Sequence, residues 1–402
     1  MGPIPRGVGL FMFRVASAFL LAFSLTATIA EPVPVLGVVR HGELFELSLI
    51  YSEAVDTVSL QTLESYSITP GELTRSRLAA TNQGVILSSA NLTANSAGTF
   101  SINGVLDETQ NPLPPQIIPF DTGNLFWTTI GGSELSLPPE VTAINTNGFD
   151  IVSGGIQQKD EYDEATFVGE ALTGDFERKV RVAFVEPAGF GAKAGIIVRE
   201  SLDEGKSRPV DPGDPSQAFS RYVGLFVSAP QTAAGEAGQG EHLILQRAQN
   251  PSIATDSLTV TNDAAPAFPD AWLQVKRVGE VFYMSRSTNG VTWESLGSAQ
   301  FPEAMPETLY VGLSFSPQND DVPVGSGLRR SFVAKFRDFI RTEQDNRIKI
   351  ERVGDHAELS WTGNWILQTA TTAAGSWENA PSQANPQTVN FSETMRFYRL
   401  RR

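Results

Sequence analysis

The 402-residue sequence contains no cysteine and only three histidines. Without cysteine the chain has no disulfide framework, no thiolate zinc site, no iron–sulfur cluster and no cysteine nucleophile. The histidines, His41, His242 and His356, lie far apart, so a catalytic triad within one module would have to use a single His. No Gly-x-Ser-x-Gly sequence marks a serine nucleophile, and the glycine-rich patterns of nucleotide sites are missing. These absences exclude most of the common catalytic mechanisms.

Basic side chains are also scarce. The chain has 30 Lys and Arg against 45 Asp and Glu, a formal charge of −15. Proteins that bind nucleic-acid backbones carry basic stripes, so no nucleic-acid partner is expected. Beyond residue 30, no segment reaches the about 18 consecutive apolar residues of a membrane span, so no span is expected in the mature protein.

The first 30 residues have the pattern of an export signal. Arg6 and Arg14 form a positively charged start, residues 15–25 are apolar, and Thr28 and Ala30 suit the small-residue positions of a cleavage site. Cleavage after Ala30 would leave 28 basic and 45 acidic side chains, a charge of −17. An uncleaved anchor is the alternative, although the apolar run is shorter than the roughly 20 residues that span a bilayer. The expected location is extracellular, at the cell surface or in the periplasm.

Residues 31–120 consist of short apolar, β-branched segments separated by turn residues, the pattern of a β-sandwich. The clearest predicted strands are residues 44–51, 84–89 and 98–103. The succession of residues 51–56, 64–68 and 102–113 resembles the bacterial immunoglobulin-like domains of exported modular proteins. That resemblance implies a spacer or adhesive unit without catalytic chemistry.

A stretch rich in proline, threonine and glycine follows, and residues 121–147 are interpreted as a linker with one strand near residues 125–127. From residue 148 to residue 345 the predicted strands are longer and more regular. Four segments in this order resemble concanavalin A-like jelly rolls of the laminin G-like type: residues 174–182, 192–202, 272–293 and 310–316. The resemblance implies two packed sheets, one of which is concave and often holds sugars.

Alternation of apolar and polar residues assigns faces to these strands. Between residues 174 and 184 the even positions are apolar, except for Arg178, and residues 175, 177, 179 and 181 are charged. In residues 192–199 the small and aliphatic even positions should pack inward, opposite Lys193 and Arg199. The polar side chains predicted for a binding face are Lys193, Arg199, Tyr222 and Gln274.

An acidic cluster, residues 159–165, is the main candidate for chemistry. Jelly-roll glucanases place carboxylates at alternate positions of one strand, as nucleophile and acid. Glu161 and Asp163 fit two positions, but Ala165 occupies the third, so no catalytic residue is assigned and a polysaccharide-cleaving enzyme stays an alternative. Calcium is the other alternative for the acidic loops, and its candidate ligands are Asp160, Glu161, Asp163, Asp320 and Asp321. No other cofactor is expected.

Residues 346–402 form a third unit with seven basic and five acidic side chains. Residues 357–361, 365–370, 375–377 and 395–402 resemble a small β module that ends many exported proteins of environmental bacteria. Its aromatic residues are expected to form the core of the module, with a stacking platform for sugars as the alternative. They are Trp361, Trp365, Trp377, Phe397 and Tyr398.

The sequence therefore predicts an exported, all-β bacterial protein: an immunoglobulin-like sandwich, a concanavalin A-like jelly roll and a small C-terminal β domain. The expected function is non-catalytic recognition of a glycan or another cell-surface component by the jelly roll, a prediction that depends on analogy of fold. The alternatives are a structural surface or adhesion protein without glycan binding and, less favoured, a glycoside hydrolase. The sequence identifies neither the ligand nor the oligomeric state.

Overall fold

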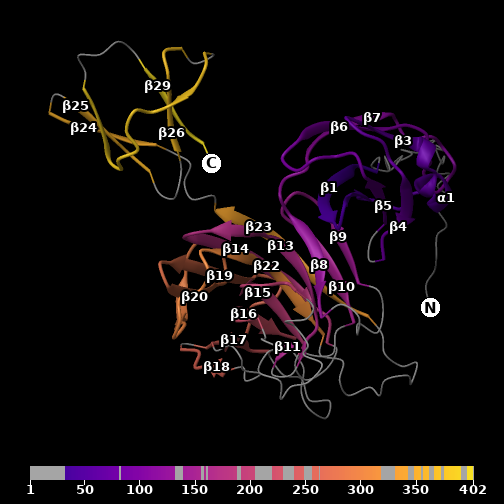
Figure 1. Cartoon of the computed structure of the whole chain (residues 1–402). Coiled ribbons are helices and arrows are strands. Elements are labelled where there is room, and N and C mark those ends of the chain that lie inside the picture. Colours follow the sequence, from indigo (N-terminus) through magenta and orange to yellow (C-terminus); the bar gives the residue numbers. More distant parts are fainter. Residues whose placement is uncertain are drawn as a thin grey trace, which may run out of the picture. The chain divides into compact units, whose positions relative to one another are not determined.

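A computed structural model describes residues 32–80, 83–131, 139–154, 158–159, 162–187, 192–203, 220–229, 240–248, 256–261, 263–317, 331–342, 348–354, 356–361, 366–372, 375–390 and 396–401. The described chain is almost wholly β, which confirms the predicted fold class (Figure 1). The predicted signal peptide lies outside the described residues. Among the helices of the described ranges, none is long and apolar enough to cross a membrane.

Residues 34–121 form two facing sets of strands. One set has the order β1-β2-β5-β4, with β1 Pro34–His41, β2 Leu44–Tyr51, β5 Gly84–Ser89 and β4 Arg75–Leu78. The other has the order β3-β6-β7, with β3 Tyr66–Thr69, β6 Ala97–Ile102 and β7 Gln116–Asp121. Between β2 and β3 lie the short helix α1 (Thr57–Gln61), capped by the Asp56 carboxylate, and the 3-10 turn Leu63–Ser65. Leu47, Leu87 and Phe100 are buried in the core between the two sets.

Two larger sheets build the central part of the chain. Seven strands of the first have the order β18-β17-β16-β15-β22-β13-β8: Asp256–Leu258, His242–Arg247, Tyr222–Ser228, Lys193–Arg199, Thr308–Ser316, Ala165–Thr173 and Phe126–Ile130. The second has the order β21-β20-β19-β14-β23-β10-β9: Glu294–Gln300, Val281–Ser287, Ala271–Val278, Phe176–Val185, Phe332–Thr342, Phe149–Ser153 and Glu140–Ala143. A separate short pair consists of β11 (Gln158–Lys159) and β12 (Tyr162–Asp163).

The core between these sheets follows the predicted alternation. Val180 and Val182 of β14 and Ile196 and Val198 of β15 are buried in one apolar cluster. Arg178, which breaks the apolar pattern of β14, is buried with them, and its Nη2 atom lies 3.0 Å from Glu170 Oε1 on β13 of the other sheet. The interruption in the sequence pattern thus marks an ion pair that connects the two sheets inside the core.

The strands of residues 121–147 join the first module to the central one. Strand β8 pairs with β13 on one side and, in parallel, with β1 on the other, so one sheet of eleven strands runs through both modules. Its Trp127 Nε1 donates to Glu46 Oε2 at 2.8 Å. Close approach of β1 to β9 requires glycine at residue 37, because a Cβ atom there would lie 2.2 Å from the Ala143 carbonyl oxygen. The structure places sheet strands where the composition suggests a linker.

The C-terminal module consists of two three-stranded sheets. The first has the order β24-β25-β28, with β24 Lys349–Val353, β25 His356–Ser360 and β28 Gln387–Asn390. The second has the order β27-β26-β29, with β27 Glu378–Asn379, β26 Ile366–Ala370 and β29 Phe397–Arg401. Trp361 is part of the buried core with Leu359 and Leu367, as expected, and Tyr398 packs against it. Trp377 and Phe397 are half-buried, and Trp365 lies outside the described residues.

Candidate functional site

Three of the four residues predicted for a binding face lie on the eleven-stranded sheet. Lys193 and Arg199 belong to β15, and Tyr222 is paired with Arg199 from the neighbouring strand β16. Arg199 and Tyr222 are 0 % exposed and Lys193 is 5 % exposed. They point away from the core, as alternation predicted, but this side of the sheet is itself buried and includes a second apolar cluster that contains Tyr222. A dissolved ligand therefore does not reach Arg199 or Tyr222.

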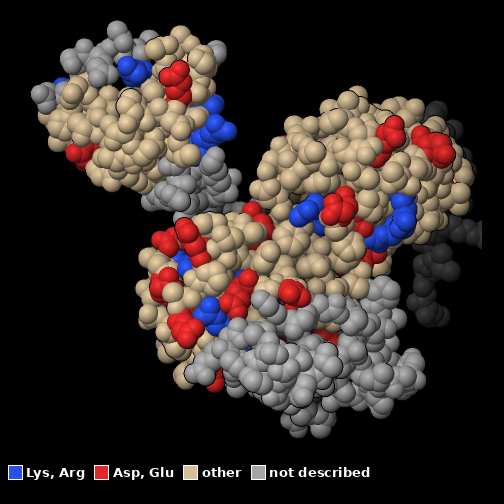
Figure 2. All heavy atoms as spheres, viewed as in Figure 1, with Lys and Arg blue, Asp and Glu red and all other residues tan. Residues whose placement is uncertain are grey.

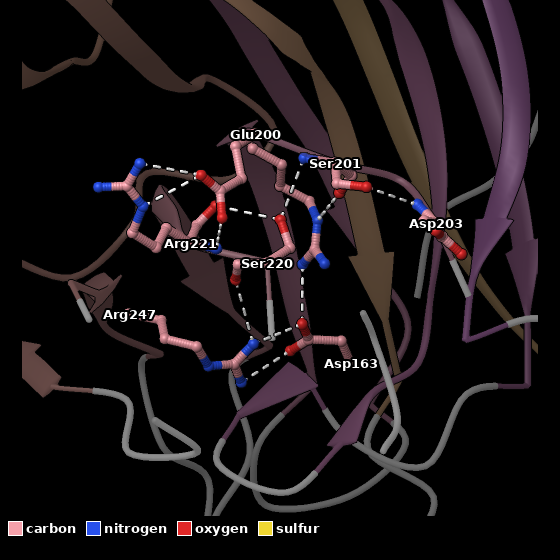
Figure 3. A network of polar contacts seen from close by, with 8 residues as sticks. Asp163, Glu200, Ser201, Asp203, Ser220, Arg221 and Arg247 are labelled. Atoms are coloured by element: carbon pink, nitrogen blue, oxygen red, sulfur yellow. Dashed lines mark hydrogen bonds and ion pairs between the residues drawn. The ribbon is translucent and has the colours of Figure 1, made fainter. Parts of the chain in front are cut away.

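Arg199 of β15 and Arg247 of β17 both donate to the Asp163 carboxylate. Figure 3 shows Arg247 directed at Asp163. Asp163 Oδ2 accepts from Arg199 Nη1 at 2.9 Å and from Arg247 Nη1 at 2.6 Å, and Asp163 Oδ1 accepts from Arg247 Nη2 at 3.1 Å. Both guanidinium groups lie over the Tyr222 ring, at 5.4 and 5.0 Å from its centroid. We call these four residues the Asp163 network; all of them are fully buried.

In the Asp163 network, arginine takes up the carboxylate that the sequence offered as a calcium ligand. Burial alone would raise the pKa of the Asp163 carboxyl, but the charges and hydrogen bonds of Arg247 and Arg199 outweigh burial and hold the pKa below its usual value. Both carboxylate oxygens are occupied by arginine. Within the described ranges, no three His, Asp or Glu residues are grouped to hold a metal ion. The other calcium candidates, Asp160, Glu161, Asp320 and Asp321, lie outside the described residues.

The fourth predicted residue, Gln274, lies on the outer face of the seven-stranded sheet. This face continues across β14, β19 and β20, where polar and aromatic side chains occupy the positions that alternate with the core. We call seven of these residues the aromatic face: Glu177, Lys179, Trp272, Gln274, Lys276, Tyr283 and Trp293. All are half-buried or exposed, and Tyr283 is 44 % exposed. Unlike the Asp163 network, this face is open to a ligand.

Strand register aligns the aromatic face in rows. Gln274 on β19 is paired with Lys179 on β14, and the next row joins Glu177, Lys276 and Tyr283 across three strands. The Trp293 ring lies beside the first row, because its centroid is 5.3 Å from Lys179 Nζ. Sugars are recognised by stacking on aromatic rings beside hydrogen-bonding side chains, and the rows supply both.

Trp272 is fixed by the turn between β20 and β21. A Cβ atom at Gly290, which has φ of +70°, would lie 2.9 Å from the indole, so the glycine permits the turn to rest on the ring. The turn is itself held by Asn289, whose Oδ1 atom accepts from the backbone N–H groups of Val291 and Thr292, both at 2.8 Å. This edge of the aromatic face is therefore preorganised.

The charges on this face are largely paired. Lys179 Nζ lies 2.7 Å from Glu177 Oε1. Burial of the Glu177 carboxyl raises its pKa, but hydrogen bonds from Lys179 and Gln274 and the nearby Lys276 charge bring the pKa below the usual value. In Figure 2 the surface over β14, β19 and β20 shows acidic and basic groups next to each other. The geometry suits a ligand that forms hydrogen bonds and stacks, without a strong charge of its own.

Sequence reasoning identified Gln274 on this face and missed its aromatic residues. The signal was present in the alternation of Trp272, Gln274 and Lys276 along β19, with Tyr283 opposite Lys276 on β20. The aromatic face is open, whereas the side of the other sheet that carries Arg199 is buried. Burial depends on which segments cover each sheet, and the alternation of residues along a strand does not reveal those segments.

Comparison with known proteins gives no family. No family model and no curated protein matches the chain. Solved structures with some likeness include a functionally unknown protein from Saccharomyces cerevisiae, at 16% identity and a TM-score of 0.34, over 54% of this chain and 94% of that one. Another is a mutant of the GH43 protein BlXynB from Bacillus licheniformis, at 9% identity and a TM-score of 0.32, over 76% of this chain and 64% of that one.

Proposed function

We propose that the chain is an exported, non-catalytic recognition protein that binds a glycan on the aromatic face of its central β-sandwich. The observation that carries this proposal is the combination, on one sheet face, of the exposed Tyr283 and Lys276 with the half-buried Trp293, Gln274 and Glu177. Aromatic rings bury the apolar side of a sugar, while the amide, ammonium and carboxylate groups bond to its hydroxyls.

The lowered pKa of the Glu177 carboxyl supports binding by this face over hydrolysis. A glycoside hydrolase needs one carboxyl group with a raised pKa as the acid and a second carboxylate across the bond. The pKa of Glu177 is lowered, and its carboxylate is bonded to Lys179, so it is a hydrogen-bond acceptor and a poor acid. Glu161, the carboxylate named for the hydrolase alternative, lies outside the described residues. Loss of reducing-sugar release in Glu161→Gln would be the sign of that alternative.

A structural or adhesive role is the second candidate. The contacts that join the first module to the central one favour this role. The Arg77 guanidinium contacts the carboxylates of Glu46 in the first module and Glu140 in the central one. Together with the shared eleven-stranded sheet, this joint suits a stiff spacer. Self-association of the purified chain without any response to glycans would favour this candidate over the first.

A glycan array tests the proposal. The wild-type chain is expected to bind at least one glycan class, and Tyr283→Ala is expected to weaken binding about five- to thirtyfold, because loss of an exposed anchor removes about 1–2 kcal/mol. The matched control is Ile117→Ala, which shortens an exposed apolar side chain of the first module. An array without signal, or equal binding by Tyr283→Ala and wild type, would refute the proposal.

A further inference from the structure

The second sheet of the C-terminal module carries a basic face. Gln368, Arg399 and Asn379 are neighbours across its three strands, and Ile366 is paired with Arg401 in the next row. Residues two apart on a strand share a face, so Arg399 and Arg401 lie on the same side, roughly 6.8 Å apart along the strand. We call Trp377, Gln368, Arg399 and Arg401 the basic face. Both arginines are exposed.

Contacts to uncharged groups hold Arg399 in place. Its Cζ atom lies 4.5 Å from the Trp377 ring centroid, and its Nε atom donates to Gln368 Oε1 at 3.0 Å. Gln368 is 2 % exposed, and its Nε2 atom donates to Asn379 Oδ1 at 3.1 Å, which fixes the amide that orients the guanidinium. A stacked, oriented guanidinium is preorganised for bidentate bonding to a planar anion.

Among the residues that the structure describes, no carboxylate contacts the two arginines of the basic face. Within the described parts of β26, β27 and β29, the one acidic residue is Glu378, which is paired with Thr369 and so belongs to the other side of the sheet. Arg399 and Arg401 form no ion pair with a described residue, in contrast to the paired charges of the aromatic face. Two exposed cations beside an aromatic ring, in a protein of net charge −15, are complementary to an anionic polymer.

We infer that the basic face is a second binding site, for a polysaccharide that carries carboxylate groups. On this side of β26 the one large aliphatic side chain is Ile366, which is 40 % exposed and paired with Arg401, so the face offers charged groups to a polymer and little apolar surface to a lipid bilayer. The inference is independent of glycan binding by the central module, since the two faces share no residue.

Affinity electrophoresis of the full chain in polygalacturonate gels tests this inference. The wild type is expected to be retarded, and Arg399→Ala and Arg401→Ala each to bind about tenfold more weakly, as loss of one charged hydrogen-bonding group predicts. Arg399→Lys keeps the charge but loses the paired N–H donors of the guanidinium, so it is expected to bind more tightly than Arg399→Ala and more weakly than the wild type. Fully methyl-esterified polygalacturonate, which lacks the charge on the same backbone, is expected not to bind.

Arg352→Ala is the matched control, because it removes one exposed charge from the other sheet of the same module. Equal losses in Arg352→Ala and Arg399→Ala, or equal retardation by the methyl ester, would overturn the inference. Binding to vesicles of anionic phospholipid that depends on Arg399, without binding to polygalacturonate, would overturn it too. Thermal unfolding confirms that each variant is folded, and Tyr283→Ala is expected to leave this binding unchanged.

Discussion

Asp163→Asn is expected to lower the free energy of unfolding by about 3–5 kcal/mol, because removal of one partner from a buried ion pair leaves the opposite charges uncompensated. Here a single carboxylate serves two guanidinium groups, and all three side chains are 0 % exposed. The amide keeps the size of the side chain and loses the charge. Urea unfolding followed by circular dichroism measures the difference.

The same carboxylate makes stability depend on pH in a defined direction. Because the pKa of Asp163 is lower in the folded chain than its usual value, its contribution is present in full above about pH 5 and is lost as the pH falls through the folded-state pKa. Asp163→Asn should therefore lose less stability than wild type on acidification. Asp256→Asn, an exposed aspartate of β18 in the same sheet, is the control and should change stability by less than about 0.5 kcal/mol. A wild-type-like Asp163→Asn would show that the network contributes little.

Glu170→Gln is expected to cost a similar amount, about 3–5 kcal/mol, for the same reason and at a different place. Glu170 and Arg178 belong to opposite sheets and lie in the core between them, 3.0 Å apart. The neutral amide would leave the Arg178 charge in an apolar layer that includes Val180 and Phe176. Chemical unfolding again gives the magnitude, with the exposed Glu303→Gln as the control.

Replacement of both partners separates the charge effect from packing. A double variant, Glu170→Leu with Arg178→Met, removes both charges and keeps most of the volume, so it should recover much of the stability lost in Glu170→Gln. If the double variant is as unstable as the single one, the pair acts through shape and hydrogen bonding, and the account of an uncompensated charge is wrong.

Local pattern was sufficient to predict several strands of this chain. Alternation and turn residues located β2 and β5 with their observed bounds and assigned Val180 and Ile196 to the core. The exception at Arg178 was visible, but its cause was not, because Glu170 lies on another sheet and pairing across sheets leaves no mark in the spacing of either strand.

The site needed information that alternation lacks. A polar position that faces away from the core is predicted to meet solvent, yet Arg199 is fully buried and Gln274 is not. The difference arises because each sheet has its own surroundings, set by contacts between segments far apart in sequence. The joint was hidden for a similar reason: β8 is five residues long, and its pairing with β1 becomes evident only when both sheets are assembled.

A calorimetric titration of wild type and Trp293→Ala with the glycan selected on the array tests the central claim most directly. We expect Trp293→Ala to bind roughly thirtyfold more weakly, since loss of a half-buried aromatic anchor removes about 2 kcal/mol, and Trp293→Phe to recover part of that loss. Val291→Ala, at an 80 % exposed position two residues away, should bind as wild type does. Equal affinities for wild type and Trp293→Ala would contradict a glycan site on the aromatic face.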